Sequence, residues 1–176
     1  MGRTCGYLTL LSAISTGAER AYLNEEGITL RDLQKDIANL VEGFKSGKRL
    51  GLMIRNELAN RSYTTNFLCN LFEEEAQDLY DVRYAILGHQ QNGGDPSAFD
   101  RIQATRLAKR CMEKLFEECA RPARRSYMCG MKHGGVEFTD LDSFYDLVDP
   151  DLQRPLDQWW MQFRRIAATM AGNLDE

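Results

Sequence analysis

The sequence predicts an all-α fold, a single compact bundle of about six or seven helices that spans residues 1–176. Apolar residues recur at spacings of three and four along most of the chain, as on the buried face of a helix. No run alternates apolar and polar residues for long enough to indicate a strand. With 43% hydrophobic residues and a formal net charge of -4, the 176 residues have the composition of one globular domain.

An amphipathic first helix is expected over residues 5–14. The same region has Arg3 before an apolar run and small residues as far as Ala18, which is also the outline of a secretory signal over residues 1–18. Polar and glycine residues interrupt the run, so we favour the helix and keep the signal peptide as the alternative. Five cysteines at irregular spacings favour a reduced, intracellular protein of the cytoplasm or nucleus.

The next helix has the clearest start signal in the chain. Thr29 followed by Asp32 forms a capping box, and an apolar stripe continues from there to Phe44. Gly47 separates this helix from a second helical segment over residues 50–60.

A third helix is expected to begin at Thr64 or Thr65 and to continue to Ile86. Gly88 follows as its left-handed stop, and residues 89–94 form the most turn-like stretch of the chain.

The longest helix is predicted to begin after Asp95 and Pro96, which suit its N-cap and first position, and to end near Ala120. Residues 130–135 are expected to form a loop, with residues 136–138 extended.

Two further helices complete the predicted bundle. Thr139 and Asp142 cap a short one, and residues 152–170 form the last, which Gly172 stops.

Charge is distributed unevenly in the second half of the chain. Residues 101–132 hold nine basic residues against three acidic ones, and residues 137–157 hold seven acidic residues against one basic. On a helix the basic side chains before residue 121 separate from an apolar face, which we expect to be buried. The residues expected to bind an anion or a partner are Arg106, Lys109, Arg110, Lys114, Arg121, Arg124, Arg125 and Tyr127.

These charges favour a non-enzymatic intracellular binding or assembly protein. It would act through the basic face 106–125 and the acidic segment 137–157, on a protein partner or on a second copy of itself. Trp160, partly exposed beside Arg164, would anchor the partner, while Trp159 would lie in the core. The alternative is an RNA-binding protein that uses the basic stripe on phosphates, although a pI of about 5.3 argues against it. No contact with a membrane is predicted.

Cys111, Cys119, Cys129 and His133 have a spacing that loosely resembles the CCCH class of zinc fingers. Eight residues of helix separate Cys111 from Cys119 by roughly 12 Å, too far for two ligands of one zinc ion. The predicted helix and a zinc site therefore exclude each other. Whether these four residues bind zinc is left open, and neither a metal site nor a cofactor is predicted.

A weaker alternative is a small all-α metal-dependent hydrolase. Glu75, Asp78 and Asp81, spaced by three, would share a helical face and hold a divalent cation. This resembles the paired carboxylate motifs of all-α nucleotide pyrophosphohydrolases, but no matching second pair is present. No catalytic residue is predicted.

Overall fold

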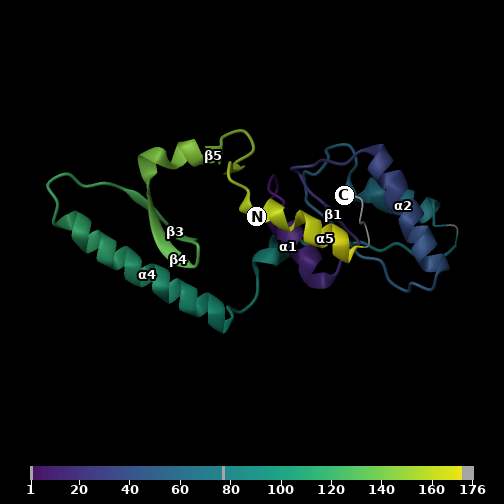
Figure 1. Cartoon of the computed structure of the whole chain (residues 1–176), viewed down its shortest axis with the longest axis horizontal. Helices are drawn as coiled ribbons and strands as arrows, with labels where there is room; N and C mark the ends of the chain where they lie inside the picture. Colours follow the sequence, from purple (N-terminus) through teal and green to yellow (C-terminus); the bar gives the residue numbers. More distant parts are fainter. Residues whose placement is uncertain (1, 77, 172–176) are drawn as a thin grey trace. The chain divides into compact units, whose positions relative to one another are not determined.

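The structure is a computed structural model that describes residues 2–76 and 78–171. The chain divides into two compact units, which we call unit 1 (Met1–Gly88 with Gln158–Glu176) and unit 2 (His89–Asp157). Both contain strands as well as helices (Figure 1), so the prediction of an all-α bundle is wrong and the fold is α/β. That residues 1–176 form one domain stays a prediction.

Unit 1 is built around two parallel strands, β1 (Arg20–Tyr22) and β2 (Met53–Arg55), which helix α2 (Leu30–Lys45) connects. This is a β–α–β unit. The expected helix over residues 50–60 is absent, and β2 lies in its place. Each strand is only three residues long, too short for its side chains to show the alternation that would reveal it in sequence.

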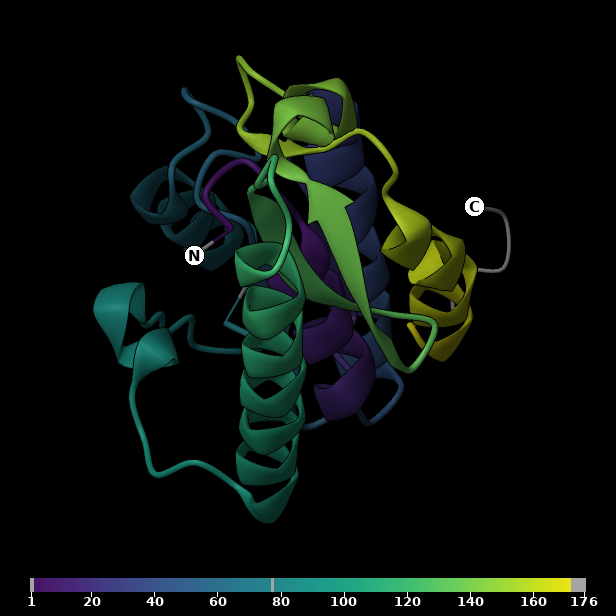
Figure 2. The ribbon, with the colours of Figure 1, turned by 90° about the vertical axis from the view of Figure 1, so that its left-hand side faces the viewer.

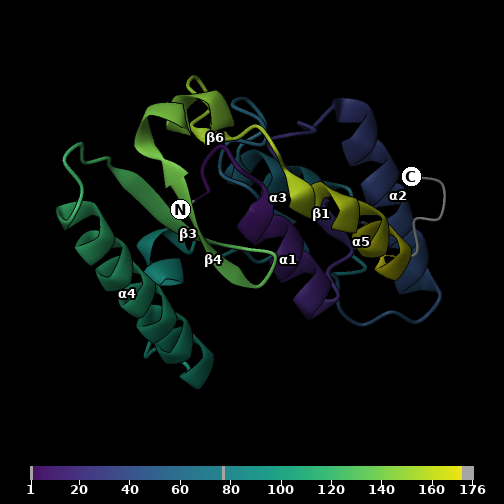
Figure 3. The same cartoon turned by 60° about the vertical axis from the view of Figure 1, so that its left-hand side comes forward.

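Helices cover both faces of this strand pair. Successive side chains of a strand point to opposite faces, so Tyr22 and Ala21 enter different cores. Tyr22 packs with α2 and α3 (Thr65–Glu74), and Ala21 with α1 (Tyr7–Thr16) and α5 (Arg164–Met170). In Figure 3, α1 and α5 run side by side. Unit 1 therefore has three layers.

The capping box of α2 is confirmed. The Thr29 hydroxyl accepts a hydrogen bond from the Asp32 N–H at 3.2 Å, and the Asp32 carboxylate accepts one from the Thr29 N–H at 2.8 Å. The first predicted helix is also confirmed as α1.

The third predicted helix begins where expected and ends early. Thr64 caps α3, which ends at Glu74 instead of continuing to Ile86. Asp78 takes a left-handed conformation (φ 60°), which an α-helix cannot continue through. Gly88 opens the 3-10 helix η1 (Gly88–Asn92) and does not stop a helix.

The main elements of unit 2 are the long helix α4 (Ala98–Cys119) and, beside it, the hairpin of β3 (Tyr127–Lys132) and β4 (Gly135–Asp140), as Figures 1 and 2 both show. The bounds of α4 match the prediction closely, although Ser97 and not Asp95 is its N-cap. The prediction of a loop over residues 130–135 is wrong, because most of these residues belong to β3 and β4. His133 and Gly134, both with positive φ, form the tight two-residue turn of the hairpin.

Short elements complete the chain. Unit 2 also contains η2 (Leu141–Leu147), β5 (Val148–Asp149) and β6 (Arg154–Pro155), where a short helix was expected after Thr139. The last predicted helix is divided into η3 (Trp159–Phe163) and α5. Gly172, its expected stop, lies outside the described residues. Among the helices that the structure describes, none has the length and apolarity needed to cross a membrane.

Candidate functional site

The predicted basic stripe of α4 lies partly against the hairpin of its own unit. The Nζ atom of Lys114 lies 4.5 Å from the centre of the Tyr127 ring and 5.9 Å from that of Phe138. The Arg110 guanidinium lies 5.9 Å from the Phe138 ring centre, and Arg106 donates a hydrogen bond to the Gly134 carbonyl at 2.9 Å. These cations therefore help to hold α4 on the hairpin.

Most of the predicted cations also have carboxylate partners within unit 2. Glu118, buried at the end of α4, accepts from Arg121 at 2.8 Å and pairs with Lys114 at 3.3 Å. Glu113 pairs with Lys109 and Arg110, and Asp140 pairs with Arg125. The five paired cations are Lys109, Arg110, Lys114, Arg121 and Arg125. Arg124 is exposed. That this set binds an outside anion or partner stays a prediction.

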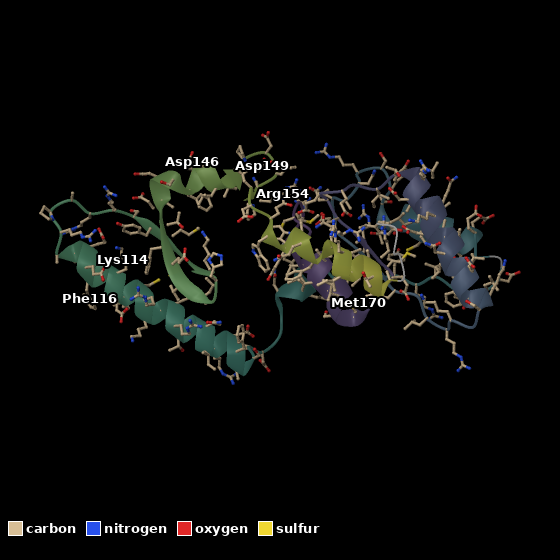
Figure 4. The ribbon with its side chains drawn as sticks, viewed as in Figure 1. Lys114, Phe116, Asp146, Asp149, Arg154 and Met170 are labelled. Carbon is tan, nitrogen blue, oxygen red and sulfur yellow. The ribbon has the colours of Figure 1, made fainter. Side chains whose placement is uncertain are left out.

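The apolar face of α4, which was expected to be buried, is exposed. Phe116 is 67% exposed, Leu115 52% and Met112 49%. Figure 4 shows Lys114 directed toward the hairpin and Phe116 directed away from it. The side of the helix that packs is instead the one that carries Arg110 and Lys114, which lie over the rings of Phe138 and Tyr127.

The two tryptophans have exchanged their expected places. Trp160 is 4% exposed and packs edge-on against Tyr7 at 5.5 Å between ring centres, whereas Trp159 is 51% exposed. Arg164 forms an ion pair with Glu26 at 2.6 Å. The expectation that Trp160 is an exposed anchor is therefore wrong.

The carboxylates considered for a metal-dependent hydrolase do not share a helical face, because α3 ends at Glu74, before Glu75, Asp78 and Asp81. Within residues 2–76 and 78–171, no group of three histidine, cysteine or acidic side chains could hold a metal ion.

A different site lies at the carboxyl ends of β1 and β2. Ligands of open α/β sheets bind at this edge. β2 leads directly into Asn56, and Asn24 follows β1 after the buried Leu23. Asn24 follows β1 and donates to the Leu58 carbonyl at 2.6 Å. Asn56 follows β2, is 3% exposed, and donates to the carbonyls of Gly2 and Cys5. The loop before α1 is thereby fixed onto this edge.

The tight fold of that loop requires glycine at position 2. Gly2 has a φ of +62°, and a Cβ atom there would lie 2.9 Å from the Cys5 carbonyl oxygen. At the other end of the loop, the Glu25 carboxylate accepts the Gly6 N–H with both oxygens, at 2.9 and 3.0 Å. This places an acidic group at the N-terminus of α1, where the helix dipole favours it.

Arg3 and Glu57 stand exposed on this supported edge. The Nε atom of Arg3 lies 3.0 Å from Oε1 of Glu57, and the side chains are 64% and 59% exposed. The Arg3 carbonyl also accepts the Leu58 N–H at 3.2 Å, which ties the two segments together. A guanidinium beside a carboxylate can bind an anion and accept hydrogen bonds from hydroxyl groups.

Sequence reasoning missed this site, because it treated Arg3 only as the start of an apolar run. The one signal that could have indicated it is the Asn56–Glu57 pair directly after a short apolar segment.

Comparison with known proteins identifies the family. The family described as Phosphofructokinase matches residues 1–115. The chain is 42% identical over 163 residues to an ATP-dependent 6-phosphofructokinase of Dictyostelium discoideum, covering 92% of this chain and 20% of that protein. It is 35% identical over 181 residues to the human muscle-type enzyme, covering 97% of this chain and 23% of the relative.

Solved structures agree with these matches. Phosphofructokinase from Saccharomyces cerevisiae superposes with a TM-score of 0.92 and 27% identity, over 97% of this chain and 24% of that one. Phosphofructokinase from Pichia pastoris in the T-state superposes with a TM-score of 0.85 and 29% identity, over 97% and 21%. The chain thus spans about a fifth to a quarter of the length of these relatives.

These matches overturn the functional predictions made from the sequence. The relatives are kinases by name, so a non-enzymatic binding or assembly protein was the wrong class of protein, and the preference for a protein that is not an enzyme was wrong. The RNA-binding and hydrolase alternatives are wrong for the same reason.

Proposed function

The chain belongs to the phosphofructokinase family, and on that premise we propose that it supplies a sugar-phosphate-binding edge of an ATP-dependent 6-phosphofructokinase. Such an enzyme transfers a phosphoryl group from ATP to a phosphorylated fructose. The chain spans about a fifth of the length of its curated relatives. We therefore assign it one binding edge and not the whole reaction.

The observation that carries this proposal is the exposed Arg3–Glu57 pair at the carboxyl ends of the parallel strands. A phosphorylated sugar presents a phosphate anion and several hydroxyl groups on one small molecule. The contact to Glu57 uses the Nε donor of Arg3, and the guanidinium has further N–H donors suited to phosphate oxygens. The Glu57 carboxylate accepts hydrogen bonds from the hydroxyl groups.

The rigid support of this edge suits phosphoryl transfer. Kinases accelerate the reaction mainly by positioning the reactants and by stabilising charge, so the acceptor sugar must be held in one orientation. Buried Asn56 and the Glu25 contact at Gly6 fix the loop that carries Arg3. A sugar phosphate bound there would have its phosphate held and its remaining hydroxyl groups oriented for attack.

We also propose an intracellular location. The five cysteines are all free, as is usual for proteins of reducing compartments, and the proposed reaction uses ATP.

The proposal is tested by calorimetric titration of the whole chain with fructose 6-phosphate, fructose and inorganic phosphate. We expect fructose 6-phosphate to bind more tightly than either fragment. Arg3→Ala and Glu57→Gln should each weaken its binding about tenfold, equivalent to about 1.4 kcal/mol. Arg31→Ala and Glu42→Gln, exposed on α2, are the matched controls and should bind like the unaltered chain. Absence of binding at about 10 mM sugar phosphate, or an equal effect of Arg3→Ala and Arg31→Ala, would overturn the proposal.

A further inference from the structure

Two cysteine thiols meet where α4 packs on the hairpin. Cys111 lies on α4 and is exposed, Cys129 lies on β3 and is half-buried, and burial and then the neighbouring Cys111 thiol raise the pKa of Cys129. The surrounding contacts place them together independently. Cys129 is the cross-strand partner of Phe138, and Arg110, the residue before Cys111, lies over the Phe138 ring.

We propose that Cys111 and Cys129 are an oxidation site, at which hydrogen peroxide closes an intramolecular disulfide between α4 and β3. The inference rests on the helix–hairpin contact within unit 2 and does not depend on the proposed sugar-phosphate site.

The chemistry proceeds in two steps. The Cys111 thiolate attacks one oxygen of the peroxide, which breaks the O–O bond, gives a sulfenic acid at Cys111 and releases water after proton uptake. The Cys129 sulfur then attacks the sulfenic sulfur, forms the S–S bond and releases a second water. Two thiols and one peroxide thus give one disulfide and two waters. A low-molecular-weight dithiol reverses the reaction by exchange.

The environments of the two thiols set their order of reaction. Cys111 is the more accessible of the pair, so peroxide reaches it first. Partial burial raises the pKa of Cys129, and the neighbouring Cys111 thiol raises it further, whereas Arg110 lowers it. Cys129 therefore remains a thiol until its partner is oxidised, which suits it to the resolving role.

The disulfide would link α4 covalently to the hairpin. The contacts described between them are largely cationic side chains on ring faces and one hydrogen bond from Arg106. A disulfide that closes the chain between Cys111 and Cys129 restricts the unfolded state, and we expect it to raise the thermal midpoint of unit 2 by about 5 °C or more.

The test is mass spectrometry of the whole folded chain, before and after a mild excess of hydrogen peroxide. Closure lowers the intact mass by about 2 Da, and the free thiols fall from five to three, since the disulfide consumes two. Trypsin digestion without reduction should then yield residues 111–114 linked to residues 126–132, and a dithiol should restore both the original mass and the lower thermal midpoint.

Three variants make the result specific. Cys119→Ser removes another exposed thiol of α4 and should close like the unaltered chain. Cys129→Ser should leave Cys111 as a sulfenic acid that a dimedone probe captures, and Cys111→Ser should show no 2 Da loss. Circular dichroism confirms that each variant folds. The proposal fails if the 2 Da loss persists in Cys111→Ser, if the linked peptide contains another cysteine, or if Cys111 is oxidised in the unaltered chain without forming a disulfide.

Discussion

The ammonium group of Lys114 lies 4.5 Å from the centre of the Tyr127 ring, between α4 and the strand that carries the ring. The Lys114 side chain is 20% exposed, so solvent only partly screens this attraction. We expect a double-mutant cycle of Lys114→Met and Tyr127→Leu to give a coupling energy of about 1 kcal/mol in urea unfolding. Lys109→Met is the control, because that side chain is 74% exposed. A coupling no larger for Lys114 than for the control Lys109 would contradict the contact.

The capping box of α2 should make stability depend on pH. The hydrogen bond from the Thr29 side chain is the main cause that lowers the pKa of Asp32 below its usual 3.8, against a smaller opposing effect of burial. A lowered folded-state pKa contributes stability that is present above pH 3.8 and is lost as pH falls through the folded value. Thr29→Ala should cost about 1 kcal/mol at pH 7, measured by urea unfolding.

Repeating that measurement near pH 2.5 is the check. The difference between Thr29→Ala and the unaltered chain should shrink as pH falls below 3.8, since protonation of Asp32 removes the charge that the Thr29 hydrogen bonds stabilise. A penalty that stays constant between the two pH values would refute the role of the carboxylate.

The exposed face of α4 predicts unequal effects of removing large apolar side chains. Phe116 is 67% exposed and Leu33 fully buried. Phe116→Gln should therefore change the free energy of unfolding by less than about 0.5 kcal/mol, whereas Leu33→Ala should lower it by about 2–5 kcal/mol. Chemical denaturation followed by circular dichroism measures both. Equal losses would show that the outer face of α4 is sheltered after all.

Tryptophan fluorescence distinguishes the two indoles. The Trp159→Phe variant retains only buried Trp160, and the Trp160→Phe variant retains only half-exposed Trp159. We expect the first variant to emit at shorter wavelength and to resist acrylamide quenching. Trp160→Phe should also lower the thermal midpoint more, because Trp160 packs on α1 through Tyr7. Stronger quenching of Trp160 than of Trp159 would reverse the assignment.

The sequence predicted best those elements whose signals are local. Thr29 and Asp32 mark the start of α2, and its apolar stripe persists over 16 residues, so both its presence and its start could be predicted. The strands β1 and β2 could not be predicted, because each is only three residues long. They are stabilised by pairing with each other, although α2 separates them in the sequence.

Helix orientation was the second failure. The bounds of α4 follow from its sequence, but periodicity shows only that two faces differ, and not which face the hairpin covers. The candidate site could not be predicted from the sequence for a related reason. Arg3 and Glu57 are 54 residues apart and meet because Asn56 and the Leu58 N–H, which follow β2, hold the loop that carries Arg3.

The placement of β1 and β2 between two layers of helices has a consequence for the motions of unit 1. Helices cover both faces of the pair, so local fraying of α1 on one side or α3 on the other leaves the hydrogen bonds between β1 and β2 in place. Deuterium from solvent should therefore reach this strand pair only when the entire unit opens, which makes these few residues the slowest to exchange in unit 1 and its last cooperative core to melt.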